Sequence, residues 1–200
     1  NLPILKKGVP ADDRYPFRSV AALNTTYFAN FGAELAVVSM LPMFFEETWG
    51  LTAAAAGLIA STFAFVNLFA RPMGGLVSDR FGNRRFVMLA YMLGIAVGFA
   101  LMGLMNSKWP LVMAVAITVG CSFFVQGAEG ATFGIIPSIK RRLTGQISGM
   151  AGAYGNVGAV FYLFVFMFVT PSQFFMIIAA GAFISWIVCL LWLKEPEGGF

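Results

Sequence analysis

The sequence predicts an all-α membrane protein with six transmembrane helices. Hydrophobic residues make up 59% of its 200 residues, charged residues only 11%, and the mean hydropathy is +0.81. Soluble proteins carry about 25% charged residues, and a soluble domain of this length could not bury so much apolar surface. The apolar residues also come in runs of about 20, which is the length that a helix needs to cross a bilayer.

Six such runs follow one another along the chain. We expect spans at about residues 20–45, 52–78, 86–105, 111–136, 145–169 and 174–193. They form one bundle at residues 19–195, between a polar, proline-containing linker at 1–18 and a short tail at 196–200.

Charged residues, aromatic residues and prolines delimit these spans. The first span ends near Trp49, and a tight basic turn at residues 79–85 separates the second from the third, which is almost wholly apolar. The fourth is expected to stop at Pro137, the fifth before Pro171 and the sixth before Pro196. Proline lacks the backbone N–H that a helix interior needs, so these positions favour turns or helix ends.

Basic residues gather on one side of the predicted bundle, the side that holds both chain ends. They are Lys6, Lys7, Arg14, Arg18, Arg80, Arg84, Arg85, Lys140, Arg141, Arg142 and Lys194. The opposite side has Lys108 together with Glu46 and Glu47. Because cytoplasmic loops are enriched in Lys and Arg, both ends are expected to be cytoplasmic in a multi-pass protein of the cell membrane.

The composition argues against several classes of function. The two cysteines, Cys121 and Cys189, lie deep in apolar runs and there is no histidine, so a disulfide, a metal site and His-based catalysis are unsupported. The chain has no pairing of a nucleophile with a base and no cofactor-binding motif, so neither an enzyme nor a cofactor is expected. The basic residues flank the membrane spans, so the net charge of +4 does not indicate nucleic-acid binding.

Arg71 is the sharpest candidate for a functional residue within the spans. A charge at the bilayer centre costs at least about 2.5 kcal/mol, although an arginine near a helix end can snorkel to the interface. Asn67, Gly74 and Gly75 share its face, however, and such a stripe is typical of a bundle interior. The guanidinium is a permanently charged planar fork that suits a flat oxyanion such as carboxylate, nitrate or nitrite.

Two carboxylates and an aromatic group accompany Arg71. Glu34 and Glu129 could carry a coupling proton, could be hydrogen-bonded structural groups, or could be the counter-charge of Arg71. Tyr27 and Phe31 fall on the face of Glu34 at helical spacing. Like Phe133 in the fourth span, they could be packing residues or aromatic walls around a planar anion.

The fifth span carries a second candidate surface. Gly145, Gly149, Gly152 and Asn156 recur at helical spacing and form one narrow stripe, and Gly155 and Gly158 lie on neighbouring faces. A small-residue stripe of this kind favours close helix packing. Glycine also exposes backbone to a ligand, so both interpretations stay open.

The turn after the second span carries a specific motif. Residues 75–85 match G-x-x-x-D-R-x-G-x-R-R at every fixed position, which is similar to the loop signature of the major facilitator superfamily. The fixed positions are Gly75, Asp79, Arg80, Gly82, Arg84 and Arg85. The resemblance implies that the six spans form one half of a transporter and that the motif braces one conformation as a gate.

The fifth span resembles the nitrate signature of the nitrate/nitrite porter family within that superfamily. Residues 151–158 read Ala-Gly-Ala-Tyr-Gly-Asn-Val-Gly. Two positions depart from the family: Tyr154 is bulky where small residues are common, and Ala159 stands where the family often has a second glycine. Residues 129–134 are similar to helix ten of cyanobacterial and plant high-affinity members. Because the family's signature in helix eleven lies in its C-terminal half, the resemblance implies that this chain is helices seven to twelve and that an N-terminal half is its partner.

The resemblance also implies residue roles. The family clasps nitrate with an arginine from each half, and Arg71 occupies the place of the C-terminal one. The expected substrate-binding residues are Arg71, Asn156, Tyr27, Phe31, Gly155 and Gly152. Nitrate or nitrite transport by alternating access is the expected function, with proton symport and nitrate/nitrite exchange both open. The alternatives are a carrier for another small organic anion and a non-transporting scaffold subunit.

Overall fold

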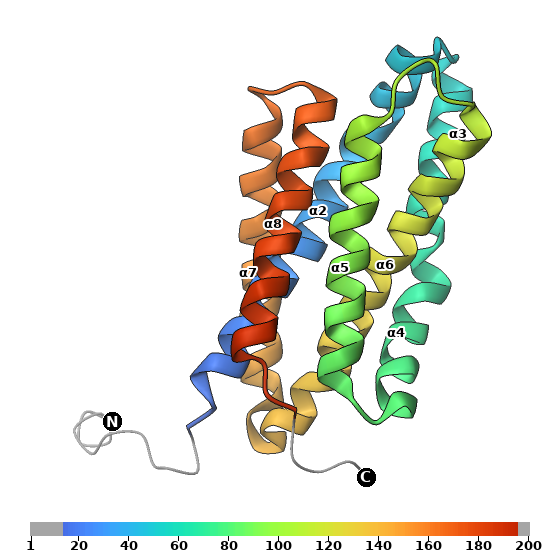
Figure 1. The fold of residues 1–200 in the computed structure, drawn as a ribbon. Coiled ribbons are helices and arrows are strands. Elements are labelled where there is room, and N and C mark those ends of the chain that lie inside the picture. The colour runs from blue at the N-terminus through green and yellow to red at the C-terminus, as the bar shows by residue number, and fades with distance from the viewer. Residues whose placement is uncertain (1–13, 196–200) are drawn as a thin grey trace.

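The computed structural model describes residues 14–195 as a bundle of long helices (Figure 1). Its elements are α2 (Phe17–Trp49), α3 (Ala53–Phe65), α4 (Asn67–Phe81), α5 (Arg84–Leu104), α6 (Leu111–Ile139), the short 3-10 helix η2 (Arg141–Leu143), α7 (Thr144–Phe166) and α8 (Pro171–Trp192). Six helical segments are long and apolar enough to cross a membrane, with α3 and α4 together making one. The predicted fold class is confirmed.

Several helix ends differ from the predicted spans. α2 begins at Phe17, inside the predicted linker, and α7 ends at Phe166 instead of near residue 169. α6 does not stop at Pro137 but continues to Ile139. A proline removes only its own N–H donor, and neighbouring helices can compensate for that loss within a transmembrane helix. The predictions for residues 1–13 and 196–200 lie outside the described residues.

The second span is divided, whereas the sequence predicted one continuous helix. α3 ends at Phe65 and α4 begins at Asn67, with Val66 as a helical turn between them. The hydroxyl of Ser122 on α6 donates a hydrogen bond of 2.5 Å to the carbonyl of Phe63, just before this break. A side chain that bonds to the helix backbone is one of the recognised causes of such an interruption.

Glycine allows three close backbone approaches that hold the bundle together. A Cβ atom at Gly130 of α6 would overlap the carbonyl oxygen of Arg71, and one at Gly74 of α4 would overlap the backbone of Gly127. A Cβ atom at Gly158 of α7 would overlap the carbonyl oxygen of Phe28 on α2. α4 therefore packs directly on α6, and α2 packs most extensively on α7.

The glycine stripe predicted for the fifth span does not provide this close packing. Gly145, Gly149 and Gly152 have open space where a Cβ atom would lie. Gly155, on a neighbouring face, instead packs against the rings of Tyr27 and Phe31. Within the described residues, α2 meets α7 along the side that carries Gly155 and Gly158, so the stripe is left open and its interpretation as a ligand-facing surface stays a prediction.

The basic turn between α4 and α5 is fixed by ion pairs and hydrogen bonds. Gly82 reverses the chain with a φ of +65°, a left-handed conformation that glycine adopts without strain. Arg84 is buried, pairs with Asp79 at 2.8 Å and also donates to the Ser138 hydroxyl on α6. One arginine thereby ties the ends of α4, α5 and α6 together.

The segment after α8 completes this network through Glu195. Its two carboxylate oxygens accept hydrogen bonds from the backbone N–H groups of Arg84 and Arg85, at 2.9 and 2.8 Å. The guanidinium of Arg85 donates to the carbonyl of Leu190 at 2.5 Å. Free N–H groups and the helix dipole favour an anion at a helix N-terminus, so Glu195 fastens the end of α8 to α5.

We predict that Gly130→Ala destabilises the protein by about 1–3 kcal/mol, because the added methyl group must push α4 away from α6. The matched control is Gly120→Ala in the same helix, where a Cβ atom meets nothing within 4 Å. The measurement is the midpoint of thermal unfolding in detergent. A midpoint for Gly130→Ala equal to that of the control would contradict the close approach of the two helices.

We also predict that Glu195→Ala frees the N-terminus of α5, at a cost of about 1 kcal/mol. Hydrogen exchange of the amides at the start of α5 should accelerate several-fold. Glu46→Ala, at an exposed position at the other end of the bundle, is the control and should leave that exchange unchanged. Equal exchange in both variants would show that Glu195 does not cap α5.

Candidate functional site

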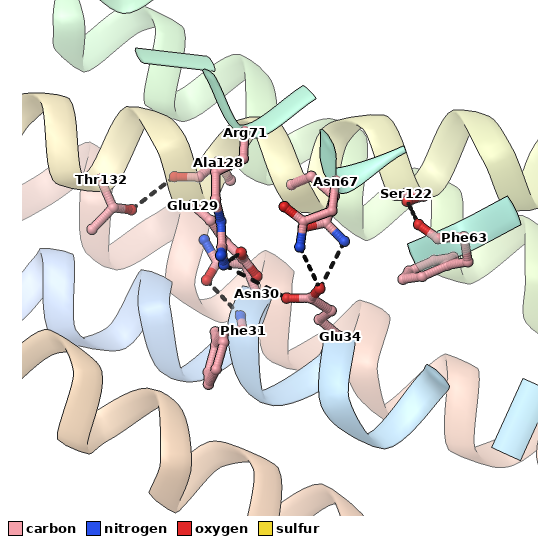
Figure 2. Close-up of polar contacts among 11 residues, drawn as sticks. Asn30, Phe31, Glu34, Phe63, Asn67, Arg71, Ser122, Ala128, Glu129 and Thr132 are labelled. Atoms are coloured by element: carbon pink, nitrogen blue, oxygen red, sulfur yellow. Dashed lines mark hydrogen bonds and ion pairs between the residues drawn. The ribbon is translucent and has the colours of Figure 1, made fainter. Parts of the chain in front are cut away.

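Arg71 on α4 lies at the centre of a polar cluster inside the bundle (Figure 2). Its guanidinium forms an ion pair with Glu129 of α6 and a longer one, at 3.8 Å, with Glu34 of α2. The side chain of Arg71 remains 36% exposed, whereas those of Glu34 and Glu129 are 8% and 0% exposed. The three predicted intramembrane charges are therefore brought together, with the arginine as the accessible member.

Glu34 is held by two amide side chains in addition to Arg71. Its Oε1 accepts hydrogen bonds from the amide nitrogens of Asn67, at 3.1 Å, and of Gln126, at 2.9 Å. Asn67 is the first residue of α4, directly after the break, and Gln126 lies on α6. The carboxylate thus connects α2, α4 and α6.

Glu129 and Asn30 are both fully buried and have unused hydrogen-bonding capacity. Neither Glu129 oxygen receives a hydrogen bond from the described residues beyond its ion pair with Arg71. The Asn30 oxygen accepts from the backbone N–H of Phe31 at 2.6 Å, and its amide nitrogen has no acceptor among residues 14–195. In Figure 2 the Asn30 amide points toward the pair formed by Arg71 and Glu129.

Aromatic rings lie beside this cluster. Tyr27 stacks on Phe31 with ring centroids 5.1 Å apart and meets Phe133 edge-on at 5.2 Å. Gly155 of α7 lies directly against the Tyr27 and Phe31 rings. Tyr27 is buried, whereas Phe133 is 39% exposed. The structure thus shows Tyr27, Phe31 and Gly155 as mutually packed residues, and that packing fixes the rings next to the polar cluster.

Gly152 and Asn156 are placed differently from the other predicted site residues. The Asn156 amide nitrogen donates to the carbonyl of Gly152 in its own helix, at 2.9 Å. Asn156 also lines a surface cavity of about 500 Å³ whose other walls are apolar side chains of α7. No hydrogen bond joins Asn156 to Arg71 within the described part of the chain.

The residues of the predicted gate lie at the end of α4 and the start of α5. Asp79 is eight positions after Arg71 on the same helix, a separation of about 12 Å at 1.5 Å per residue. Gly75 lies one turn after Arg71, where an added Cβ atom would lie 3.6 Å from the carbonyl oxygen of Gly130. Arg80 is exposed at the helix end. The two groups of polar residues are therefore joined by two turns of one helix.

This arrangement can bind anions and protons but offers no metal site. Groups of three or more His, Cys, Asp or Glu side chains that could hold a metal ion do not occur among residues 14–195. Asn30 and Gln126 are site residues that the sequence did not single out as candidates. Their spacing of three to four residues from Tyr27, Glu34 and Glu129 was the available signal, because residues at this spacing share a helix face.

Comparison with known proteins agrees with this geometry. Residues 23–200 match the Major Facilitator Superfamily family model. The nitrate/nitrite transporter NrtP of Picosynechococcus sp. is 48% identical over 98% of this chain and 40% of its own length. The high-affinity nitrate transporter 2.3 of Oryza sativa subsp. japonica is 38% identical over 72% of the chain and 29% of its own length. Elsinochrome transporter 1 of Elsinoe fawcettii is 30% identical over 86% and 35%.

Two curated relatives match almost the whole of this chain, and the chain spans about two fifths of their length. The relatives confirm the resemblance to nitrate/nitrite porters that the loop motif and the fifth span indicated, and they are transporters, not enzymes. This multi-pass membrane chain belongs to the major facilitator superfamily.

Proposed function

We propose that this chain is one six-helix half of an alternating-access transporter for nitrate and nitrite. The observation that carries the proposal is Arg71, a permanent cation held inside a membrane-spanning bundle with more than a third of its side chain accessible. Relatives named as nitrate/nitrite and nitrate transporters support the choice of substrate.

The chemistry of Arg71 favours a small planar anion. A guanidinium cannot lose its proton and presents several N–H donors in one plane, which match two oxygens of nitrate or nitrite at once. The same charge repels inorganic cations. In the proposed site, Tyr27 and Phe31 form an aromatic wall near the anion, and the segment at Gly152, Gly155 and Asn156 borders the path on α7.

The proposed partner is a second six-helix half, which would make this chain helices seven to twelve of the transporter. Large apolar side chains on α4 and α7 are exposed in the bundle, among them Leu68, Phe69, Val160 and Phe164. Such surface needs lipid or protein to cover it. In superfamily members the substrate lies near the bilayer midplane between the two halves, and Arg71 lies on one of these helices.

In this proposal the basic turn is the cytoplasmic gate. The ion pair between Asp79 and Arg84 and the bonds to Glu195 hold one conformation, and they must loosen for α4 to move against α5 and α6. Both ends of the segment lie on the cytoplasmic side of the cell membrane. Support comes from Figure 1, where the start of α2, the end of α8 and the turn between α4 and α5 lie at the same end of the bundle, and from the basic residues of that end.

A second candidate is transport of another small organic anion by the same mechanism. Elsinochrome transporter 1 is 30% identical to this chain and is named for a different substrate. Competition of unlabelled nitrate and organic anions against labelled nitrate distinguishes the two candidates. Nitrate should compete well below the concentration of any organic anion if the first proposal is correct.

We predict that Arg71→Lys in the intact transporter weakens nitrate binding about 10- to 100-fold. Lysine keeps the charge but cannot form two parallel bonds to one anion, and hydrogen bonds to charged groups contribute about 1.5–3 kcal/mol. The measurement is the half-saturating nitrate concentration for uptake into proteoliposomes. The control is Arg18→Lys, at an exposed position at the start of α2. Unchanged affinity in Arg71→Lys would remove Arg71 from the binding site.

A further inference from the structure

We propose that Glu129 is the residue that takes up a proton during transport, and that it does so when an anion displaces its carboxylate from Arg71. This inference rests on the proposed function and identifies the coupling group within the same site. It follows from three features of the cluster: one shared guanidinium, two unequal carboxylates and one unused donor.

An entering anion and Glu129 require the same binding partner. The Arg71 guanidinium is occupied by Glu129, with Glu34 further away at 3.8 Å. The buried Nε atom of Arg71 has no hydrogen-bond acceptor among the described residues. An oxyanion that uses two N–H groups of the fork in parallel must therefore push the Glu129 carboxylate aside.

The two carboxylates differ in what they retain after that displacement. Glu34 keeps its hydrogen bonds from the amides of Asn67 and Gln126, so one of its oxygens still has two donors. Glu129 is fully buried and has no donor besides Arg71 within the described region. A buried carboxylate without a donor or counter-charge is neutralised by protonation. Glu129 is therefore the carboxylate that takes up a proton when it is displaced from Arg71.

Asn30 offers the displacing anion a second donor. Its amide nitrogen is fully buried and unpaired, while its oxygen is fixed by the backbone N–H of Phe31. Asn30 lies one turn before Glu34 on α2, and its amide is directed at the cluster (Figure 2). An anion between Arg71 and Asn30 would satisfy both sets of unused N–H groups.

Proton uptake keeps the charge of the site constant. With both carboxylates ionised, the empty cluster has one positive and two negative groups. If an anion binds and Glu129 stays ionised, a third negative charge enters an apolar region. If instead a hydronium ion transfers its proton to a Glu129 oxygen and leaves as water, one new O–H bond replaces one that breaks, and the net charge is unchanged.

The other titratable groups around α6 do not offer an alternative carrier. Glu129 pairs with Arg71 on α4, and the other titratable groups near that guanidinium are Glu34 and Tyr27 on α2. On α5, Tyr91 packs against Gly127, on another face of α6. The two tyrosines of α7 line the apolar groove between α2, α7 and α8. The other charged residues of α4, α5 and η2 lie at the cytoplasmic helix ends, and α3 has no titratable side chain.

The first test compares two modes of transport by the intact transporter in proteoliposomes. In wild type, an imposed pH gradient should drive nitrate accumulation. In Glu129→Gln that accumulation should fall about tenfold or more relative to the rate at which the same variant exchanges internal nitrite for external nitrate, because coupling is lost. Glu46→Gln, an exposed carboxylate at the other end of the bundle, is the control and should keep its response to the gradient.

The second test measures protons directly and does not depend on the variant's stability. Calorimetric titration of wild type with nitrate, in two buffers of different ionisation enthalpy, should show uptake of about one proton per anion bound. Wild type that binds nitrate without taking up protons would overturn the role of Glu129. That role is also overturned if Glu129→Gln keeps gradient-driven accumulation, or if Glu34→Gln alone loses it. Wild type that neither binds nor transports nitrate or nitrite would instead refute the proposed function.

Discussion

The ion pair between Arg71 and Glu129 is the interaction on which the rest of this bundle depends. A guanidinium within a membrane span is costly unless it has a counter-charge, and the counter-charge lies on a different helix. The backbones of α4 and α6 can approach closely enough for the pair only because Gly74 and Gly130 have no side chains. The ion pair therefore requires the glycines, because only their close packing brings the two charges together.

The same pair connects the proposed binding site to the end of the bundle that carries the basic turn. α4 begins at a helix break beside Asn67, carries Arg71 one turn later and ends at the turn that Arg84 and Glu195 hold. A short helix with a polar network at each end can move as one body. If an anion changes what Arg71 contacts, α4 carries that change toward Asp79, which gives the proposed gate a physical route to sense occupancy.

The sequence predicted the number of spans, their order and the three intramembrane charges, because apolar runs and rare charges are local signals. It could not predict which charges pair, since the contact between Arg71 and Glu129 depends on how α4 and α6 pack. The break at Val66 has no glycine to mark it and is accompanied by a hydrogen bond from Ser122, far away in sequence. The sequence likewise could not predict which glycine face of α7 packs on α2, because several faces of that helix carry glycine.

The roles of Glu34 and Glu129 illustrate what only the structure distinguishes. Both are acidic residues in the middle of apolar spans, and the sequence left them equivalent. The difference is that Glu34 has two amide partners and Glu129 has none within residues 14–195. That difference comes from Asn67 and Gln126, neutral residues whose spacing indicates a shared face but not a partner.

The most direct test of this account is a structure of the intact transporter with nitrate bound. The account predicts nitrate against the Arg71 guanidinium, within hydrogen-bond distance of the Asn30 amide nitrogen, with the Glu129 carboxylate moved off the arginine and the bonds from Asn67 and Gln126 to Glu34 intact. Nitrate bound elsewhere, with the ion pair between Arg71 and Glu129 unbroken, would contradict it.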